Sequence, residues 1–286
     1  MKKIFALLLF TGFSGLFFYA CNTAGSGKPY AIQMRLAKGD TFRQDMQMKM
    51  LMNSSGMEMN MNMNSGCSFE VVNSTADEKD IKVTYTQMKM TTDMGALKSH
   101  NPDSAINKNY ENIIGKSVML KLSKDNEIMD VTGFDEIVNS QARDSASKEM
   151  MKKMFSKEQL NNTFGMLFSI YPKHPVKVGE SWNNESNIKM ANIDMKIANK
   201  YTLLSVKDGY AEINIDGTIG AAGNMMKNAS GLKMDMSGTQ KGTVNLRMDN
   251  GYLHNGAYKM DMTANMEMMG KKMTMTMKSN YLTKGD

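Results

Sequence analysis

The residues with the most distinctive chemistry are methionines, of which the chain has 34 among its 286 residues. A thioether sulfur is a soft ligand that favours Cu(I) over hard cations. It is also part of a flexible, polarisable apolar side chain that can repack around varied shapes, and it can be oxidised reversibly to the sulfoxide. The methionines could therefore serve a metal, an apolar ligand or an oxidant, and their spacing bears on which.

The methionines alternate with polar residues. A methionine stands at every second position in 46–52, 57–63 and 273–277. A period of two places all the methionines of a run on one face of a β-strand and the polar residues on the other. We therefore predict half-buried antiparallel strands with a methionine face inward. The predicted ligand face comprises Met46, Met48, Met50, Met57, Met59, Met61, Met63, Met273, Met275 and Met277.

Turn sequences separate the alternating runs. Asn53-Ser-Ser-Gly56 and Met269-Gly-Lys-Lys272 join methionine runs, and Lys207-Asp-Gly209 and Asp249-Asn-Gly251 are short turns of a kind typical of β-hairpins. Residues 30–36 also alternate, and we expect them to form the first strand. The sequence thus predicts a mainly β fold with antiparallel sheets.

Two segments of the chain echo one another. Gly179-Glu-Ser-Trp182, which contains the only tryptophan, has the same order of residue types as Gly39-Asp-Thr-Phe42: glycine, acid, hydroxyl, aromatic. We therefore predict two pseudo-repeated β-rich halves, residues 30–133 and 172–286. The alternative is that any antiparallel sheet reuses such turns.

Residues 134–171 have a helical character instead. Ser156-Lys-Glu-Gln159 fits a capping box at a helix start. Leu160, Phe164, Leu167 and Phe168 follow at helical spacing and form one apolar stripe. We predict a helical insertion between the halves, which makes the fold class α+β. The stripe either packs on the sheet or acts as a helix lid over a cavity.

The first residues have the pattern of an export signal. Lys2 and Lys3 precede an apolar run from Ile4 to Phe18, which is short for the roughly 20 residues of a membrane span. Cys21 follows a small residue and resembles the cysteine of bacterial lipoprotein signals, which becomes the new amino terminus and carries the lipid. We expect a signal peptide at 1–20, lipidation of Cys21, and a flexible tether at 21–29.

Residues that could support catalysis do not form a recognisable pattern. His100, His174 and His254 stand far apart without zinc-ligand spacing. Acylation of Cys21 would leave Cys67 as a single thiol, which we expect to be buried or in a loop. We predict a protein that is not an enzyme, without a cofactor and without a metal site of histidines and acids. The net charge of +6 is spread along the chain without a basic block, so no nucleic-acid partner is expected.

Several of these segments also occur together in a known family. The lipoprotein-like signal, Lys38-Gly-Asp-Thr-Phe42, the turn at Asp125-Asn126, the helical middle and Tyr171–Trp182 together resemble an uncharacterised family of Bacteroidota lipoproteins, domain-of-unknown-function family 6263. The resemblance implies a β-rich fold and a place in the cell envelope, at the outer membrane. It implies no activity and no site residues.

Three functions remain open from the sequence. The first is a membrane-anchored binding module for a lipid or other apolar ligand on the methionine face. The second is a Cu(I)- or Ag(I)-binding protein that uses thioethers. The third is a structural envelope lipoprotein in which methionine is generic core. An oxidant sink fits less well, because the alternation turns most of the sulfurs inward. The side of the outer membrane and any protein partner stay open.

Overall fold

The structure is a computed structural model that describes residues 27–54, 56–93, 111–124, 126–141, 169–190, 193–224, 233–268 and 271–286. Over these ranges the chain forms one large sheet and a single helix, α2 (Phe134–Gln141). The strands are β1 (Thr41–Ser54), β2 (Met57–Ser74), β3 (Glu78–Asp93), β4 (Ser117–Ser123), β5 (Ile128–Thr132), β6 (Ser181–Met190), β7 (Ile193–Lys207), β8 (Tyr210–Asn224), β9 (Lys233–Arg247), β10 (Leu253–Met268) and β11 (Lys271–Gly285).

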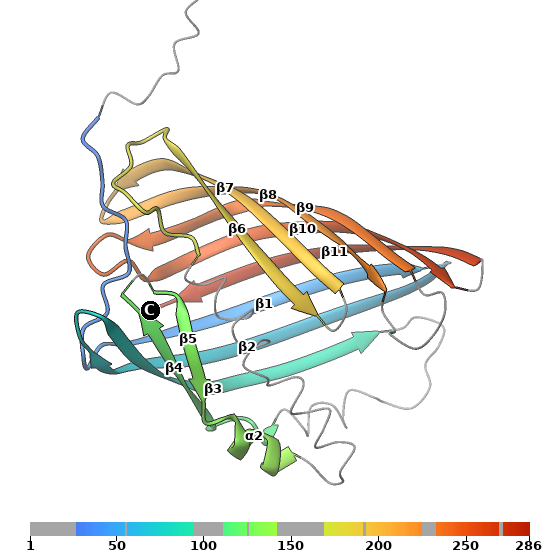
Figure 1. Ribbon diagram of the computed structural model, residues 1–286, viewed down its shortest axis with the longest axis horizontal. Coiled ribbons are helices and arrows are strands. Elements are labelled where there is room, and N and C mark those ends of the chain that lie inside the picture. The colour runs from blue at the N-terminus through green and yellow to red at the C-terminus, as the bar shows by residue number, and fades with distance from the viewer. Residues whose placement is uncertain are drawn as a thin grey trace, which may run out of the picture.

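All the strands belong to one antiparallel sheet of 11 strands (Figure 1). Their order is β5-β4-β3-β2-β1-β11-β10-β9-β8-β7-β6. The meander β1–β5 runs outward to one edge, the meander β6–β11 runs inward from the other, and the two meet where β1 pairs with β11. The predicted mainly β, antiparallel fold is confirmed. Both predicted halves contribute to this one sheet.

The α+β label is not supported. The only helix in the described part of the chain is α2, whose Ile137 packs into the core beside β4. Most of the predicted helical insertion, residues 142–168, lies outside the described residues. No helix within the described residues is long and apolar enough to cross a bilayer.

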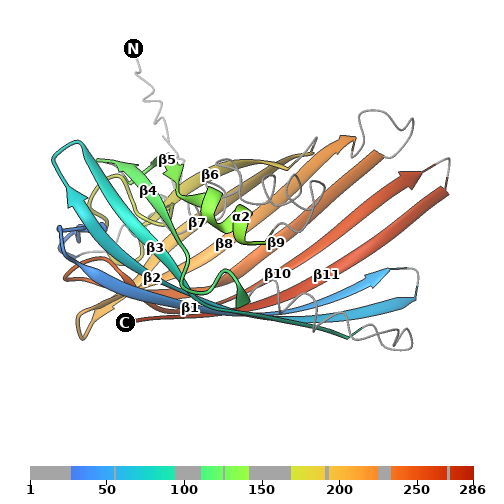
Figure 2. The same cartoon turned by 90° about the horizontal axis from the view of Figure 1, so that it is seen from below.

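The sheet is curved into a trough, with β1 and β11 along its floor and the edge strands β5 and β6 at the tops of its sides (Figure 2). Glycines on the inner face permit this curvature where neighbouring strands come close. A Cβ on Gly242 of β9 would stand 2.5 Å from Cα of Tyr258 on β10. A larger residue there would force the two strands apart.

Strand register places the methionines on the inner face. Met48 lies opposite Met63, and Met50 lies opposite Met61. The alternate residues, such as Lys49 and Asn62, are exposed on the outer face. The sheet therefore has an apolar inner face and a polar outer face.

Residues 30–36 close one end of the trough. Ile32, Met34 and Leu36 are buried alternately, but the segment is not a strand of the sheet. It instead bonds to separate places: Tyr30 pairs with Val176 before β6, the Arg35 amide donates to the Asn250 carbonyl (2.8 Å), and the Leu36 carbonyl accepts from Ser74 at the end of β2 (2.8 Å). The predicted strand at 30–36 is thus wrong, although its buried face is as predicted.

The two echoing turns have the same local geometry. Gly39 and Gly179 have φ angles of 91° and 86°. The acid that follows each, Asp40 or Glu180, accepts a hydrogen bond from the backbone amide three residues earlier, at 2.8 and 2.9 Å. The likeness is local. It does not confirm a duplication of the two halves.

Candidate functional site

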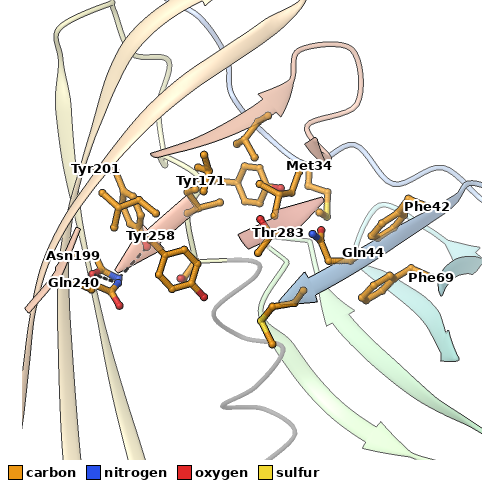
Figure 3. A pocket seen from close by; sticks show the side chains of 17 residues that line it. Met34, Phe42, Gln44, Phe69, Tyr171, Asn199, Tyr201, Gln240, Tyr258 and Thr283 are labelled. Atoms are coloured by element: carbon orange, nitrogen blue, oxygen red, sulfur yellow. Dashed lines mark hydrogen bonds between the residues drawn. The ribbon is translucent and has the colours of Figure 1, made fainter. Parts of the chain in front are cut away.

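A cavity of about 150 Å³ lies between the inner face of the sheet and residues 169–171 (Figure 3). Most of its wall is aromatic or aliphatic, with Phe42 and Phe69 on one side and Tyr201, Ile215 and Leu246 on the other. Among the described residues that line it, none is charged. The cavity is thus an apolar site with a few neutral polar groups.

Residues 169–171 form a bar across the trough that is held at both sides. On the β6 side, Trp182 Nε1 donates to the Ile170 carbonyl and Asn184 Nδ2 donates to the Ser169 carbonyl, each at 2.9 Å. On the other side, the Tyr171 hydroxyl donates to the Gly251 carbonyl in the β9–β10 turn at 2.7 Å. Burial raises the pKa of Tyr171, so its phenol stays neutral and keeps donating.

A pair of amides spans β7, β8 and β9 on the inner face. Asn199 and Gln240 flank Gly217 in register, and Gln240 Nε2 donates to Asn199 Oδ1 across it at 2.7 Å. Asn199 Nδ2 in turn donates to the Tyr201 hydroxyl at 3.1 Å. Gln240 is only 4% exposed, and its Oε1 has no hydrogen-bond partner in the described part of the chain.

Two further polar atoms on the cavity wall lack a partner within the described ranges: Gln44 Nε2 on β1 and Thr283 Oγ1 on β11. Thr283 lies opposite Met46, so Gln44 is its diagonal neighbour on the same face. Leaving a buried donor or acceptor unpaired costs roughly 1–3 kcal/mol. Such atoms mark places where a bound molecule would complete the hydrogen bonding.

Tyr258 lies between these two polar positions (Figure 3). Its ring stacks on that of Tyr281, with the centroids 4.5 Å apart. Burial raises the pKa of Tyr258 and of Tyr201, so both phenols are neutral at physiological pH. The described wall of the cavity therefore carries no formal charge.

Of the predicted ligand face, Met46 lines the cavity. The other predicted methionines continue along the same face of β1, β2 and β11, away from the closed end. The last of them, Met57 and Met273, are 60% and 42% exposed. One row crosses four strands, because Met59 lies opposite Met52, Met52 opposite Met277, and Met277 opposite Met262. Met52 and Met262 thus join the face that the sequence predicted.

Two of the predicted sites lie outside the described residues. Cys21 lies outside the described residues, as do the four lid residues Leu160, Phe164, Leu167 and Phe168. Lipidation and the helix lid therefore stay predictions.

The cavity's polar residues were missed by sequence reasoning. Gln240, Gln44 and Thr283 belong to no motif. One signal was available, the alternation along the strand that contains Met260 and Met262. Because every second residue faces inward, Tyr258 shares the face of these methionines. Gln240 lies opposite Met260 on the neighbouring strand and therefore faces inward too.

Cys67, His174 and His254 lie within the described residues. Burial, with a smaller effect from Asp45, raises the pKa of the Cys67 thiol to about 12, so the thiol stays protonated. The His254 ring packs at a tilt against Tyr210, and His174 Nδ1 lies 3.2 Å from the adjacent Pro175 carbonyl oxygen. His100 lies outside the described residues, and within them no three His, Cys, Asp or Glu side chains are grouped to hold a metal ion.

The fold and the site together define a trough-shaped antiparallel β protein with a neutral cavity at its closed end. Residues 76–253, more than half of the chain, match the family of unknown function DUF6263, and the chain belongs to this family. No curated protein sequence matches it.

Two solved structures show distant likeness. Lipovitellin, from a study of its lipid–protein interactions, aligns with 87% of this chain at 8% identity and a TM-score of 0.47, and this chain spans only 25% of it. An outer membrane channel from Pseudomonas putida F1 aligns with 88% of this chain and 97% of its own, at 6% identity and a TM-score of 0.21. At these scores neither likeness carries an argument about function.

Proposed function

We propose that this protein is a membrane-anchored, non-catalytic binding module of the cell envelope that holds a lipid or other apolar ligand in the trough of its sheet. The observation that carries the proposal is the cavity under residues 169–171, with its apolar wall and its position at the head of the methionine face. A lipid on Cys21 would attach the protein to the outer membrane.

The size of the cavity indicates how a ligand would lie. A volume of about 150 Å³ matches cavities that hold benzene, whereas sites for larger small molecules run to roughly 300–1,000 Å³. The cavity would therefore take one end of a ligand. The remainder would extend from Met46 along the half-buried methionines of β1 and β2, whose flexible side chains can adapt to an alkyl chain.

The absence of catalysis is part of the proposal. Among the described residues that line the cavity, the titratable side chains are tyrosines, and burial raises the pKa of Tyr171, Tyr201 and Tyr258 further from the neutral range in which a general base works. A wall of this kind suits binding and release.

Trp182 offers a direct test, since it is the chain's only tryptophan and its ring stacks on Tyr201 of the cavity wall, with centroids 5.7 Å apart. We would titrate the full chain, purified from bacterial membranes, with long-chain compounds brominated at successive positions, because bromine quenches indole fluorescence at short range. We expect saturable quenching that depends on the bromine position and is reversed by the unbrominated compound. If no long-chain compound quenches saturably, the binding proposal fails.

The row of Met59, Met52, Met277 and Met262 favours a second candidate, a Cu(I) or Ag(I) site. Neighbouring strands lie about 4.8 Å apart, so flexible thioethers in one row can converge on a soft ion. Calorimetric titration of the full chain with Ag(I) tests this candidate. A defined stoichiometry with tight binding would support it, and weak, unsaturable uptake would refute it.

A further inference from the structure

We infer that the ligand of the cavity is an uncharged amphiphile that enters with its polar end first and whose neutral hydroxyl or amide groups bond to the unpaired atoms of the cavity wall, on Gln240, Thr283 and Gln44. The inference rests on the proposed function and names its ligand class. Long-chain alcohols, monoacylglycerols and fatty amides belong to this class. Fatty acids and phospholipids do not.

Gln240 fixes one requirement on the ligand. Its Nε2 is already used in the 2.7 Å bond to Asn199, which leaves Oε1 as the atom of this amide without a partner in the described residues. Oε1 can only accept a hydrogen bond, and the Gln240 side chain is buried, with 4% of its surface exposed. The group that completes its hydrogen bonding must therefore be a donor, which a carboxylate, an ester oxygen or a phosphodiester cannot be.

The other polar position sets the complementary requirement. Gln44 Nε2 can only donate, so its partner must accept, and the Thr283 hydroxyl can do either. A hydroxyl or a primary amide both donates and accepts. A monoacylglycerol carries both kinds of group, with hydroxyls as donors and an ester carbonyl as acceptor.

The charge of the wall excludes ionised ligands. Lysine, arginine, histidine, aspartate and glutamate are all missing from the described residues that line the cavity. A carboxylate or ammonium group in such a wall would lose its hydration without gaining a counter-ion, which is strongly unfavourable. A neutral polar group loses far less, and the unpaired atoms repay that loss with hydrogen bonds.

The test compares four probes of one chain length: octadecene, oleyl alcohol, monooleoylglycerol and oleate at mildly alkaline pH. Each displaces a brominated long-chain alcohol from the full protein, and the recovery of Trp182 fluorescence reports its affinity. We expect the alcohol and the monoacylglycerol to bind about ten-fold or more tightly than oleate, because of the charge penalty.

Two variants assign the effect to the named atoms. Gln240→Leu removes the acceptor, and Thr283→Val removes a hydroxyl at nearly constant shape. Each should weaken binding of the alcohol about three- to ten-fold and leave octadecene unchanged or tighter. Gln47→Leu and Thr276→Val are matched controls on the outer face, where both residues are exposed, and should change neither.

The possible outcomes separate the two proposals. If no probe binds, the proposed function fails and takes the inference with it. If all four probes bind equally, or oleate binds best, the binding function stands and the inference is overturned. If both cavity variants bind the alcohol as the parent does, the polar atoms bond to water instead of to a ligand head, which also overturns it.

Discussion

Gly217→Ala is expected to destabilise the protein by disturbing the hydrogen-bonded amides of Asn199 and Gln240 in the cavity wall. Gly217 lies in register between Asn199 and Gln240. A Cβ at this position would overlap Asn199 Oδ1 and stand 2.9 Å from Gln240 Cγ and 3.2 Å from the Ala198 carbonyl oxygen. The hydrogen bond between the two amides passes over the glycine, so the methyl group and the bond compete for the same space.

The magnitude follows from what the displaced amides lose. Gln240 is almost fully buried, so losing its bond to Asn199 leaves a polar N–H without a partner, at about 1–3 kcal/mol. Alanine in place of glycine within a strand recovers about 0.5–1 kcal/mol. The net expectation is a loss of up to about 2.5 kcal/mol in the free energy of unfolding, where Gly220→Ala predicts a gain.

Gly220→Ala is the matched control on the same strand. A Cβ there meets nothing within 4 Å, and Gly220 lies on the exposed outer face. It should stabilise the protein by up to about 1 kcal/mol, since only the entropy of the unfolded chain changes. Urea denaturation of the two variants and the parent measures both effects. If Gly217→Ala stabilises as Gly220→Ala does, the amide pair does not hold the geometry described, and Gln240 Oε1 is not held as an unpaired acceptor.

Three further predictions address the bar, the buried phenols and the methionine row. Tyr171→Phe leaves the buried Gly251 carbonyl without its donor, so urea denaturation should show a loss of about 1–3 kcal/mol. Stability should fall as pH rises above 10: burial raises the folded-state pKa of Tyr171 and Tyr258, so the unfolded chain loses these protons first, at about 1.4 kcal/mol per pH unit for each residue. Tyr258→Phe removes one of these protons, so the fall in the free energy of unfolding per pH unit should be smaller by about 1.4 kcal/mol when denaturation is measured across this pH range. Met52→Leu should abolish tight Ag(I) binding in calorimetry if thioethers ligate the ion, and unchanged Ag(I) affinity would remove Met52 from any such site.

The local pattern of the sequence was sufficient to predict strand faces and several turns. A period of two assigns Met48 and Met63 to one face without knowledge of their partners, and the hairpin turn makes them neighbours. The pairing of β1 with β11 could not be predicted in this way. Met52 and Met277 lie opposite one another although they are 225 positions apart in the chain (277 − 52). No local sequence pattern predicts which residues pair at such a separation.

The cavity was harder to predict because its defining residues look ordinary in sequence. Gln240 is a single polar residue in an alternating strand. It lines a cavity because it lies on the inner face and because residues 169–171 cross the trough there. Residues 30–36 illustrate the opposite error. Alternating burial of Ile32, Met34 and Leu36 is the pattern of a strand, but the backbone groups of that segment bond to three separate places at the end of the trough.

Methionine is part of the core in one cluster, around Met236, but it is missing from the most deeply buried positions of the described residues. The largest fully buried side chains of the described residues are phenylalanine, isoleucine, leucine and valine, such as Phe69, Ile81 and Leu203, and none is a methionine. Branched residues lose less rotamer entropy on burial and suit strands better, which fits their place in the fully buried core. The methionines of β1, β2 and β11 lie instead along the half-buried inner wall that leads from the cavity. A chain that needed only core would gain stability from branched residues there as well, whereas a wall that must adapt to a ligand gains from flexible thioethers.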